Sequence, residues 1–201
     1  MVCEKYLHTK LSVIDGIFQI GYYYKKAVTQ FQKENDILTA HILRLKNRRN
    51  KVYAQPLCRA MYLLIKNRFP LLLDAEAIIP VPNHVDDEDR DVKAIALAEE
   101  LSEQFKKDGR NVQVQHAIKK VKNISTHRLN RDQKEIVVEN GMFEFDNKTS
   151  VKQKKIILVD DVLTNGIIKG KCGSILKENG AQKIWGLVAG RNFSEPTWYD
   201  N

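Results

Sequence analysis

Residues 156–166 read Ile156-Ile157-Leu158-Val159-Asp160-Asp161-Val162-Leu163-Thr164-Asn165-Gly166, and this stretch is the most informative in the chain. Its four leading aliphatic residues predict a central strand covered on both faces, as in a parallel sheet. Asp160 and Asp161 then lie at the carboxyl end of that strand, the edge at which open α/β sheets bind their ligands. The turn at 164–166 precedes a run at 167–178 with roughly helical spacing. Free amides at such a helix start favour an anion, so the stretch can hold a phosphorylated sugar.

Apolar runs on both sides of this stretch predict further strands and helices of an α/β domain. Strands are expected at residues 77–82, where two prolines end the run, at 112–114 and at 183–189. Residues 89–107 carry apolar side chains at helical intervals, whereas 135–145 are expected to be extended. Strands that alternate with helices imply right-handed crossovers, a parallel sheet and helices on both of its faces.

The N-terminal third of the chain is interpreted as a small appendage. Residues 14–24 predict a short strand or hairpin, and 33–46 and 53–66 predict helices. A chain of 201 residues with 43% hydrophobic content can bury a full core without disulfides or metals. The expected division is an appendage at 1–75, a sheet domain at 76–192 and a tail at 193–201.

Cysteine usage and hydropathy favour a protein of the cytoplasm. Cys3, Cys58 and Cys172 are odd in number and lack paired spacing, so neither a disulfide framework nor a zinc site is indicated. No apolar run reaches the roughly 18 to 20 residues that a membrane-spanning helix needs. Met1-Val2-Cys3-Glu4-Lys5 also lacks the order of a secretion signal. We therefore expect a cytoplasmic protein with no membrane partner.

The net charge of +8 and the pI near 9.3 favour an anionic partner, either nucleic acid or a polyphosphorylated small molecule. The densest basic patch, residues 44–51, could follow a phosphate backbone, or it could be a solvated turn between helices. Aromatic residues that would stack on bases are missing around this patch. Nucleic acid therefore stays open as a partner, beside a small phosphorylated ligand.

An aliphatic run, two acids, two more aliphatics, a Thr-x-Gly turn and a helical run follow one another in residues 156–178. This order resembles the signature of the type I phosphoribosyltransferases, which bind phosphoribosyl pyrophosphate. The resemblance implies their α/β fold, and it implies that Asp160 and Asp161 are the catalytic pair that bonds the ribose 2′- and 3′-hydroxyls. The 5′-phosphate loop would comprise Val162, Leu163, Thr164, Asn165 and Gly166. Taken alone, two acids after a strand can also simply end it in water.

The motifs before the signature are similar in order to those of the ComF/GntX branch, whose members are associated with DNA uptake. A strand ending in Pro80-Val81-Pro82-Asn83-His84, a helix, a basic segment at 128–132 and the run Asn140-Gly141-Met142-Phe143-Glu144-Phe145 follow one another. The Lys46 region is similar to the branch's upstream Leu-Lys-Tyr element. The resemblance covers most of residues 20–191, and the zinc ribbon that often opens this branch is absent from the sequence.

Two segments depart from the family pattern. The turn reads Thr164-Asn165-Gly166-Ile167-Ile168 where the family usually has Thr-Thr-Gly, a small residue and Ser or Thr, so two phosphate-facing hydroxyls are lost. Ile167 and Ile168 either narrow the loop or pack beneath it as helix core. Residues 85–93, next to the family's pyrophosphate position, carry five acids, which would repel a pyrophosphate unless a metal ion intervenes.

Few cations could face the pyrophosphate, and each has a second interpretation. His84 and Arg90 belong to or adjoin the acidic segment, where Arg90 could be a surface residue and His84 a turn or cap residue. Lys119, Arg128 and Arg131 belong to a later basic segment. That segment could close over the leaving group, or it could only solubilise the domain.

The resemblance implies transfer of a phosphoribosyl group to a nitrogenous base, with Mg²⁺ held through the substrate and not directly by the protein. The base would stack near Tyr22, Tyr23, Tyr24 or Phe31. Superfamily members are frequently dimers, which implies a homodimer. The departures leave a second hypothesis open, a non-catalytic member that senses phosphoribosyl pyrophosphate or a nucleotide and assists DNA handling. We therefore expect a glycosyltransferase or its non-catalytic descendant.

Overall fold

The computed structural model describes residues 11–24, 36–48, 51–82, 92–122, 124 and 129–192. None of the helices in these ranges is long and apolar enough to cross a bilayer. In chain order the elements are β1 (Gly16–Tyr23), α2 (Ile37–Arg48), η3 (Lys51–Tyr53), α3 (Ala54–Arg68), η4 (Pro70–Asp74), β2 (Ala77–Pro80), α4 (Val92–Lys107), β3 (Gln113–Val114), β4 (Ile118–Lys120), α5 (Arg131–Glu139), β5 (Phe143–Phe145), β6 (Lys155–Leu163), α6 (Ile167–Glu178) and β7 (Lys183–Asn192).

Five strands form one parallel sheet in the order β1-β7-β6-β2-β3. β6 lies at its centre, between β2 and β7, and every residue of β6 after Lys155 is buried. The predicted strands around 77–82, 112–114 and 183–189 are present as β2, β3 and β7. The predicted α/β fold with a parallel sheet is therefore confirmed.

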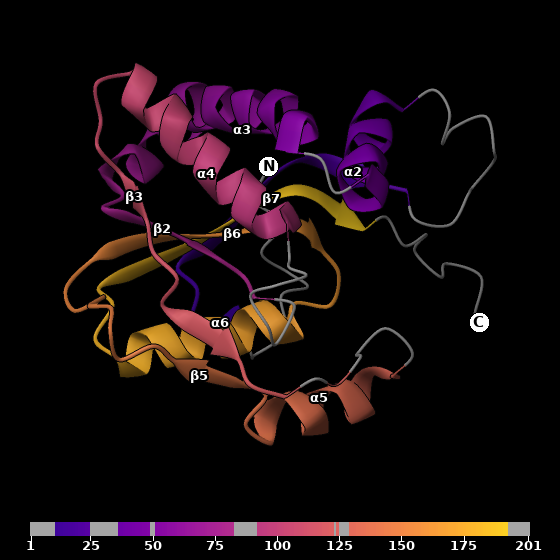
Figure 1. The fold of residues 1–201 in the computed structure, drawn as a ribbon, viewed down its shortest axis with the longest axis vertical. Helices are drawn as coiled ribbons and strands as arrows, with labels where there is room; N and C mark the ends of the chain where they lie inside the picture. Colours follow the sequence, from indigo (N-terminus) through magenta and orange to yellow (C-terminus); the bar gives the residue numbers. More distant parts are fainter. Residues whose placement is uncertain are drawn as a thin grey trace.

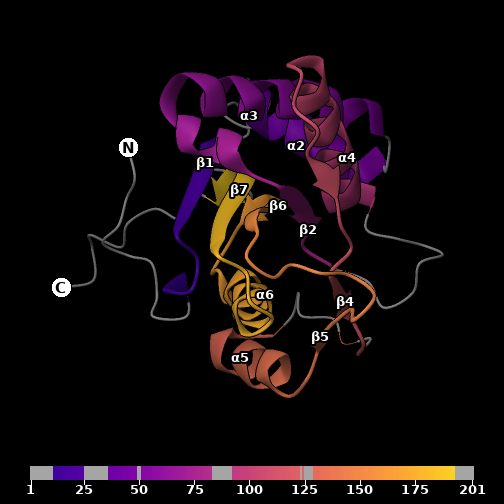
Figure 2. The same cartoon turned by 90° about the vertical axis from the view of Figure 1, so that its left-hand side faces the viewer.

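Helices cover both faces of this sheet. Figures 1 and 2 show α2, α3 and α4 on one face and α6 on the other. Side chains along β6 alternate between the two layers: Ile157 and Val159 pack with the α3 and α4 side, whereas Ile156 and Leu158 pack with the α6 side. A strand that is buried on both faces needs apolar residues at every position, which is why its sequence is a continuous aliphatic run.

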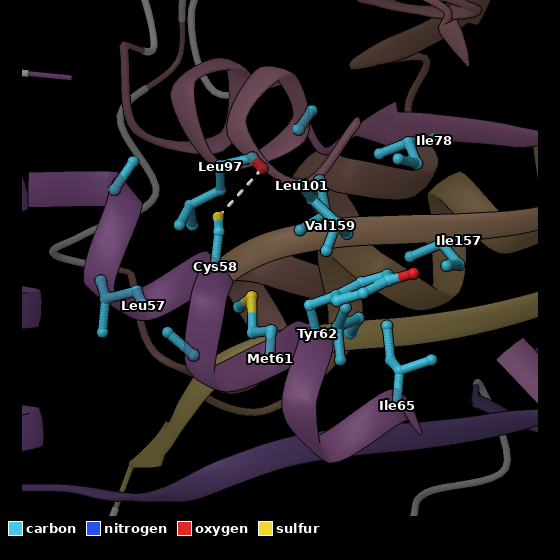
Figure 3. Close-up of a cluster of buried hydrophobic side chains, with 14 of the residues drawn as sticks. Leu57, Cys58, Met61, Tyr62, Ile65, Ile78, Leu97, Leu101, Ile157 and Val159 are labelled. Carbon is cyan, nitrogen blue, oxygen red and sulfur yellow. Dashed lines mark hydrogen bonds between the residues drawn. The ribbon is translucent and has the colours of Figure 1, made fainter. Parts of the chain in front are cut away.

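The core on the side of α3 and α4 is drawn in Figure 3. Cys58 of α3 and Leu97 of α4 meet there above Val159 of β6, and the Cys58 Sγ donates a hydrogen bond to the Leu97 carbonyl at 3.2 Å. Burial raises the pKa of the Cys58 thiol, so this group is a small core residue and not a reactive thiolate.

A second, smaller sheet lies beyond α6. β4 and β5 pair antiparallel there, and α5 packs against α6 (Figure 2). The prediction that 135–145 is extended was wrong for most of its length, because residues 131–139 form α5 and only 143–145 form a strand. A capping box explains the helix start: the Asn130 side chain accepts from the Gln133 amide, and the Gln133 side chain accepts from the Asn130 amide.

The segment expected as an N-terminal appendage contributes to the main sheet. β1 pairs in parallel with β7, with Gly16 opposite Trp185 and Tyr23 opposite Asn192. Predicted helices at 33–46 and 53–66 correspond to α2 and α3, whose residues pack into the same core as β6. The division into an appendage, a sheet domain and a tail stays a prediction, and the tail at 193–201 lies outside the described residues.

Candidate functional site

Both acids of the central stretch lie near the carboxyl edge of the sheet, inside β6 and not beyond its end. The strand continues through Asp160 and Asp161 to Leu163. Asp160 is 7% exposed and Asp161 is 9% exposed. Buried carboxylates need partners, because an unpaired charge in an apolar environment is strongly unfavourable. Each of these acids has a lysine, and the two lysines come from opposite layers.

Asp160 is paired with Lys169 of α6. The Lys169 ammonium donates to the Asp160 Oδ2 and also, at 2.9 Å, to the Val162 carbonyl. The other carboxylate oxygen of Asp160 accepts from the Asp161 amide at 2.8 Å. The two side chains of this ion pair are 10% and 5% exposed. Lys169 therefore fastens the end of β6 to the first turns of α6, within a region closed to water.

Asp161 is paired with Lys46 of α2, on the other face of the sheet. The Lys46 Nζ lies 3.4 Å from the Asp161 Oδ2, and it also lies 4.7 Å from the centre of the Tyr23 ring. Burial, and after it the charge of Asp161, raises the pKa of Tyr23, so this ring stays neutral below the basic range. The Lys46 side chain is 27% exposed, so this pair is open to solvent on its lysine side, unlike the Asp160 pair.

The turn after β6 depends on glycine. Gly166 has φ +76°, in the left-handed region, and a Cβ on it would lie 2.5 Å from the Leu11 Cδ1. Leu11 is buried and covers this side of the turn. Thr164 is exposed and Asn165 is half-buried, and the Asn165 Oδ1 accepts from the Ile167 amide at 3.4 Å. The part of the turn that a phosphate could reach is therefore the stretch from Thr164 to Asn165, at the start of α6.

The isoleucines that follow the turn belong to the core. Ile167 is 4% exposed, and Ile168 is partly buried against the same cluster on the α6 side. Of the two alternatives for this pair, packing beneath the turn is the one that the structure shows.

Two of the predicted pyrophosphate cations lie among the described residues, and each is paired with an acid outside the central stretch. Lys119 belongs to β4 and pairs with the Asp146 Oδ2 at 3.0 Å. Arg131 begins α5 and its Nε lies 3.6 Å from the Glu135 Oε1. Both belong to the segment that forms β4, α5 and β5 (Figure 1), and their role at the pyrophosphate stays a prediction. His84, Arg90, Arg128 and Phe31 lie outside the described residues.

Sequence reasoning missed the two lysines as partners of the acids. Lys169 lies in the first turn of α6, and α6 packs back against β6, the strand that precedes it. A lysine at this position could therefore have been predicted to pair with an acid near the end of β6. Lys46 carries no such signal, because its contact with Asp161 joins residues far apart in the sequence.

Comparisons with known proteins give a limited result. No protein family and no curated protein matches the sequence. Among solved structures, a hypoxanthine phosphoribosyltransferase from Staphylococcus aureus is 9% identical, with 73% of this chain and 76% of that chain covered and a TM-score of 0.45. An allosteric regulatory enzyme of purine biosynthesis is 15% identical, with 68% of this chain covered and a TM-score of 0.41; the chain spans only 26% of that enzyme. At these identities and TM-scores, the likeness carries no conclusion about the activity of this chain.

Proposed function

We propose that this chain binds phosphoribosyl pyrophosphate at the carboxyl edge of β6 and transfers the phosphoribosyl group to a nitrogenous base. One observation carries the proposal: two adjacent buried carboxylates lie near the carboxyl end of the central strand of a parallel sheet, two residues before a glycine-dependent turn and a helix start. This arrangement supports the proposal, because a sugar phosphate needs acceptors for its hydroxyls next to donors for its phosphate.

Within the proposal, the two acids have different tasks. Separation of Lys169 from Asp160 would leave an unpaired charge in a buried environment, so this ion pair stays intact when a ligand binds. The role of Asp160 is therefore to orient the end of β6 and the turn. Asp161 is the acid that accepts hydrogen bonds from the ribose hydroxyls, because its partner Lys46 is accessible to solvent and can be displaced. A carboxylate that accepts from hydroxyls makes charge-assisted hydrogen bonds, which are stronger than neutral ones.

The turn supplies the phosphate contacts. The exposed Thr164 hydroxyl and the side-chain amide of the half-buried Asn165 offer donors, and the positive end of the helix dipole adds attraction for an anion. Loss of two hydroxyls relative to the family pattern weakens phosphate binding by about 1–3 kcal/mol.

In the proposal, Mg²⁺ reaches the site together with the substrate. Within the described ranges, no group of three or more His, Cys, Asp or Glu side chains could hold a metal ion. Asp161 carries oxygen donors of the kind that Mg²⁺ prefers, so it can attract a metal that arrives on the pyrophosphate. When bound, the metal would neutralise charge on the leaving group. The residues of the chain would hold the ribose so that the base can approach C1, which is a contribution of orientation.

Titration calorimetry with phosphoribosyl pyrophosphate and Mg²⁺ tests the proposal. Wild-type protein is expected to bind, and Asp161→Asn is expected to bind about tenfold or more weakly, since a charge-assisted acceptor is lost. Asp108→Asn is the matched control, because Asp108 is also paired with a lysine and a tyrosine but lies elsewhere on the surface. A folded wild-type protein that gives no binding would remove the proposal.

Release of pyrophosphate in the presence of a panel of bases tests the transfer step separately. Binding with no release for any base would leave recognition of the sugar phosphate in place and remove the catalytic part.

A further inference from the structure

We propose that Lys46 is a specificity residue that reads the pyrophosphate end of the sugar. In the ligand-bound protein its ammonium leaves Asp161 and donates to the pyrophosphate, while Asp161 accepts from the ribose hydroxyls. The inference rests on the proposed function and deepens it, because it names the residue that distinguishes phosphoribosyl pyrophosphate from ribose 5-phosphate.

The first step is that the Lys46 contact can exchange. Its Nζ lies 3.4 Å from Asp161 and 4.7 Å from the Tyr23 ring centre, and the side chain is 27% exposed. The lysine of this pair is partly exposed, so a ligand can replace it at Asp161, provided that the ligand's hydroxyls donate to the buried carboxylate in its place. The ring of Tyr23 keeps the ammonium close to the edge of the sheet during the exchange.

The second step is direction. The turn and α6, which would hold the 5′-phosphate, lie on one face of the sheet, whereas α2 lies on the other (Figure 2). A ribose that is held over Asp161 with its 5′-phosphate toward α6 has its C1 substituent pointing away from that phosphate. Lys46 approaches from that second side, so the anionic group that it meets is the pyrophosphate.

The third step is selectivity. A sugar with hydroxyls but no anion on C1 breaks the Asp161–Lys46 ion pair when it binds to Asp161. The Lys46 ammonium is then left without an anionic partner. A sugar with pyrophosphate on C1 gives the ammonium a stronger anionic partner. Selectivity then arises both from the new contact and from the penalty on ligands that lack it.

The test compares two ligands on four proteins. Wild type, Lys46→Met, Lys46→Arg and Lys66→Met are titrated with phosphoribosyl pyrophosphate and with ribose 5-phosphate, each with Mg²⁺, after thermal unfolding has shown that each is folded. Lys66 is a close match to Lys46, since it pairs with Asp108 at 2.8 Å and lies 5.9 Å from the Tyr62 ring centre.

Lys46→Met is expected to lower the affinity for phosphoribosyl pyrophosphate about tenfold or more. The affinity for ribose 5-phosphate is expected to stay the same or rise, because no ammonium then competes with the ribose hydroxyls for Asp161. Lys46→Arg is expected to keep most of the affinity, and Lys66→Met all of it. Equal losses for both ligands in Lys46→Met, or no loss, would overturn the inference while the proposed function stands. Wild-type protein that binds neither ligand would overturn both.

Discussion

Asp160 and Asp161 are neighbours on one strand, yet their ion pairs differ in kind. In the buried pair, Asp160–Lys169, both side chains are closed to water and the lysine also holds the Val162 carbonyl. In the open pair, Asp161–Lys46, the acid is buried but the lysine is in contact with solvent. The two carboxylates are nearly equally exposed, so the burial of the amine decides which pair is structural and which can exchange.

The largest expected effect comes from removing the lysine of the buried pair. Lys169→Met leaves Asp160 as an unpaired buried charge and removes a donor from Val162, so unfolding should become easier by about 3–5 kcal/mol. Lys46→Met, the same change in the open pair, should destabilise the protein less than Lys169→Met, because water can take the place of the partly exposed Lys46 beside Asp161. Urea unfolding of both variants measures the difference, and equal effects would break the distinction between the pairs.

Gly166 tests how rigid the α6 side of the site is. Gly166→Ala forces a side chain into a left-handed backbone conformation and against Leu11, so we expect a loss of about 1–3 kcal/mol in the free energy of unfolding. Chemical denaturation also shows which cause is larger. In a Leu11→Ala background the clash is relieved but the strain of φ +76° remains, so a loss that vanishes there would rule out backbone strain.

Asp15 offers a third carboxylate, at the amino edge of the same sheet. Burial raises the pKa of Asp15, but hydrogen bonds from the Ile184 amide and from the ammonium groups of Lys183 and Lys177 outweigh it, so the pKa lies below its usual value. A carboxyl whose pKa is lower in the folded than in the unfolded protein stabilises the fold above its unfolded pKa, and this contribution is lost as the pH falls through the folded pKa.

Asp15→Asn should therefore destabilise the protein by about 1.5 kcal/mol at neutral pH, and the difference from wild type should shrink below about pH 4. Unfolding curves at a series of pH values measure this difference. Binding of phosphoribosyl pyrophosphate should be the same in both proteins at neutral pH, because Asp15 is remote from the candidate site. A difference that is constant down to pH 2 would show that the Asp15 charge contributes nothing.

The strand and the helix on either side of the turn could be predicted because their own sequences determine their secondary structure. Residues 156–159 are aliphatic at every position, as burial on both faces demands, and the helix at 167–178 begins directly after its glycine turn. α5 could not be predicted from periodicity, because its exposed Ile136 interrupts the apolar pattern and its start depends on a capping box. The pairing of each acid with its lysine was not predictable either, since it arises only when the layers pack on the sheet.

The placement of β1 has a consequence for synthesis on the ribosome. β1 is the first described strand to be made and β7, its only neighbour in the sheet as described, is the last. The backbone hydrogen bonds between β1 and β7 cannot form until nearly all of the intervening chain has been synthesised. Contacts between segments so far apart in the sequence also slow folding. The nascent chain therefore carries an unpaired strand edge, a known starting point for aggregation, until translation has passed residue 192.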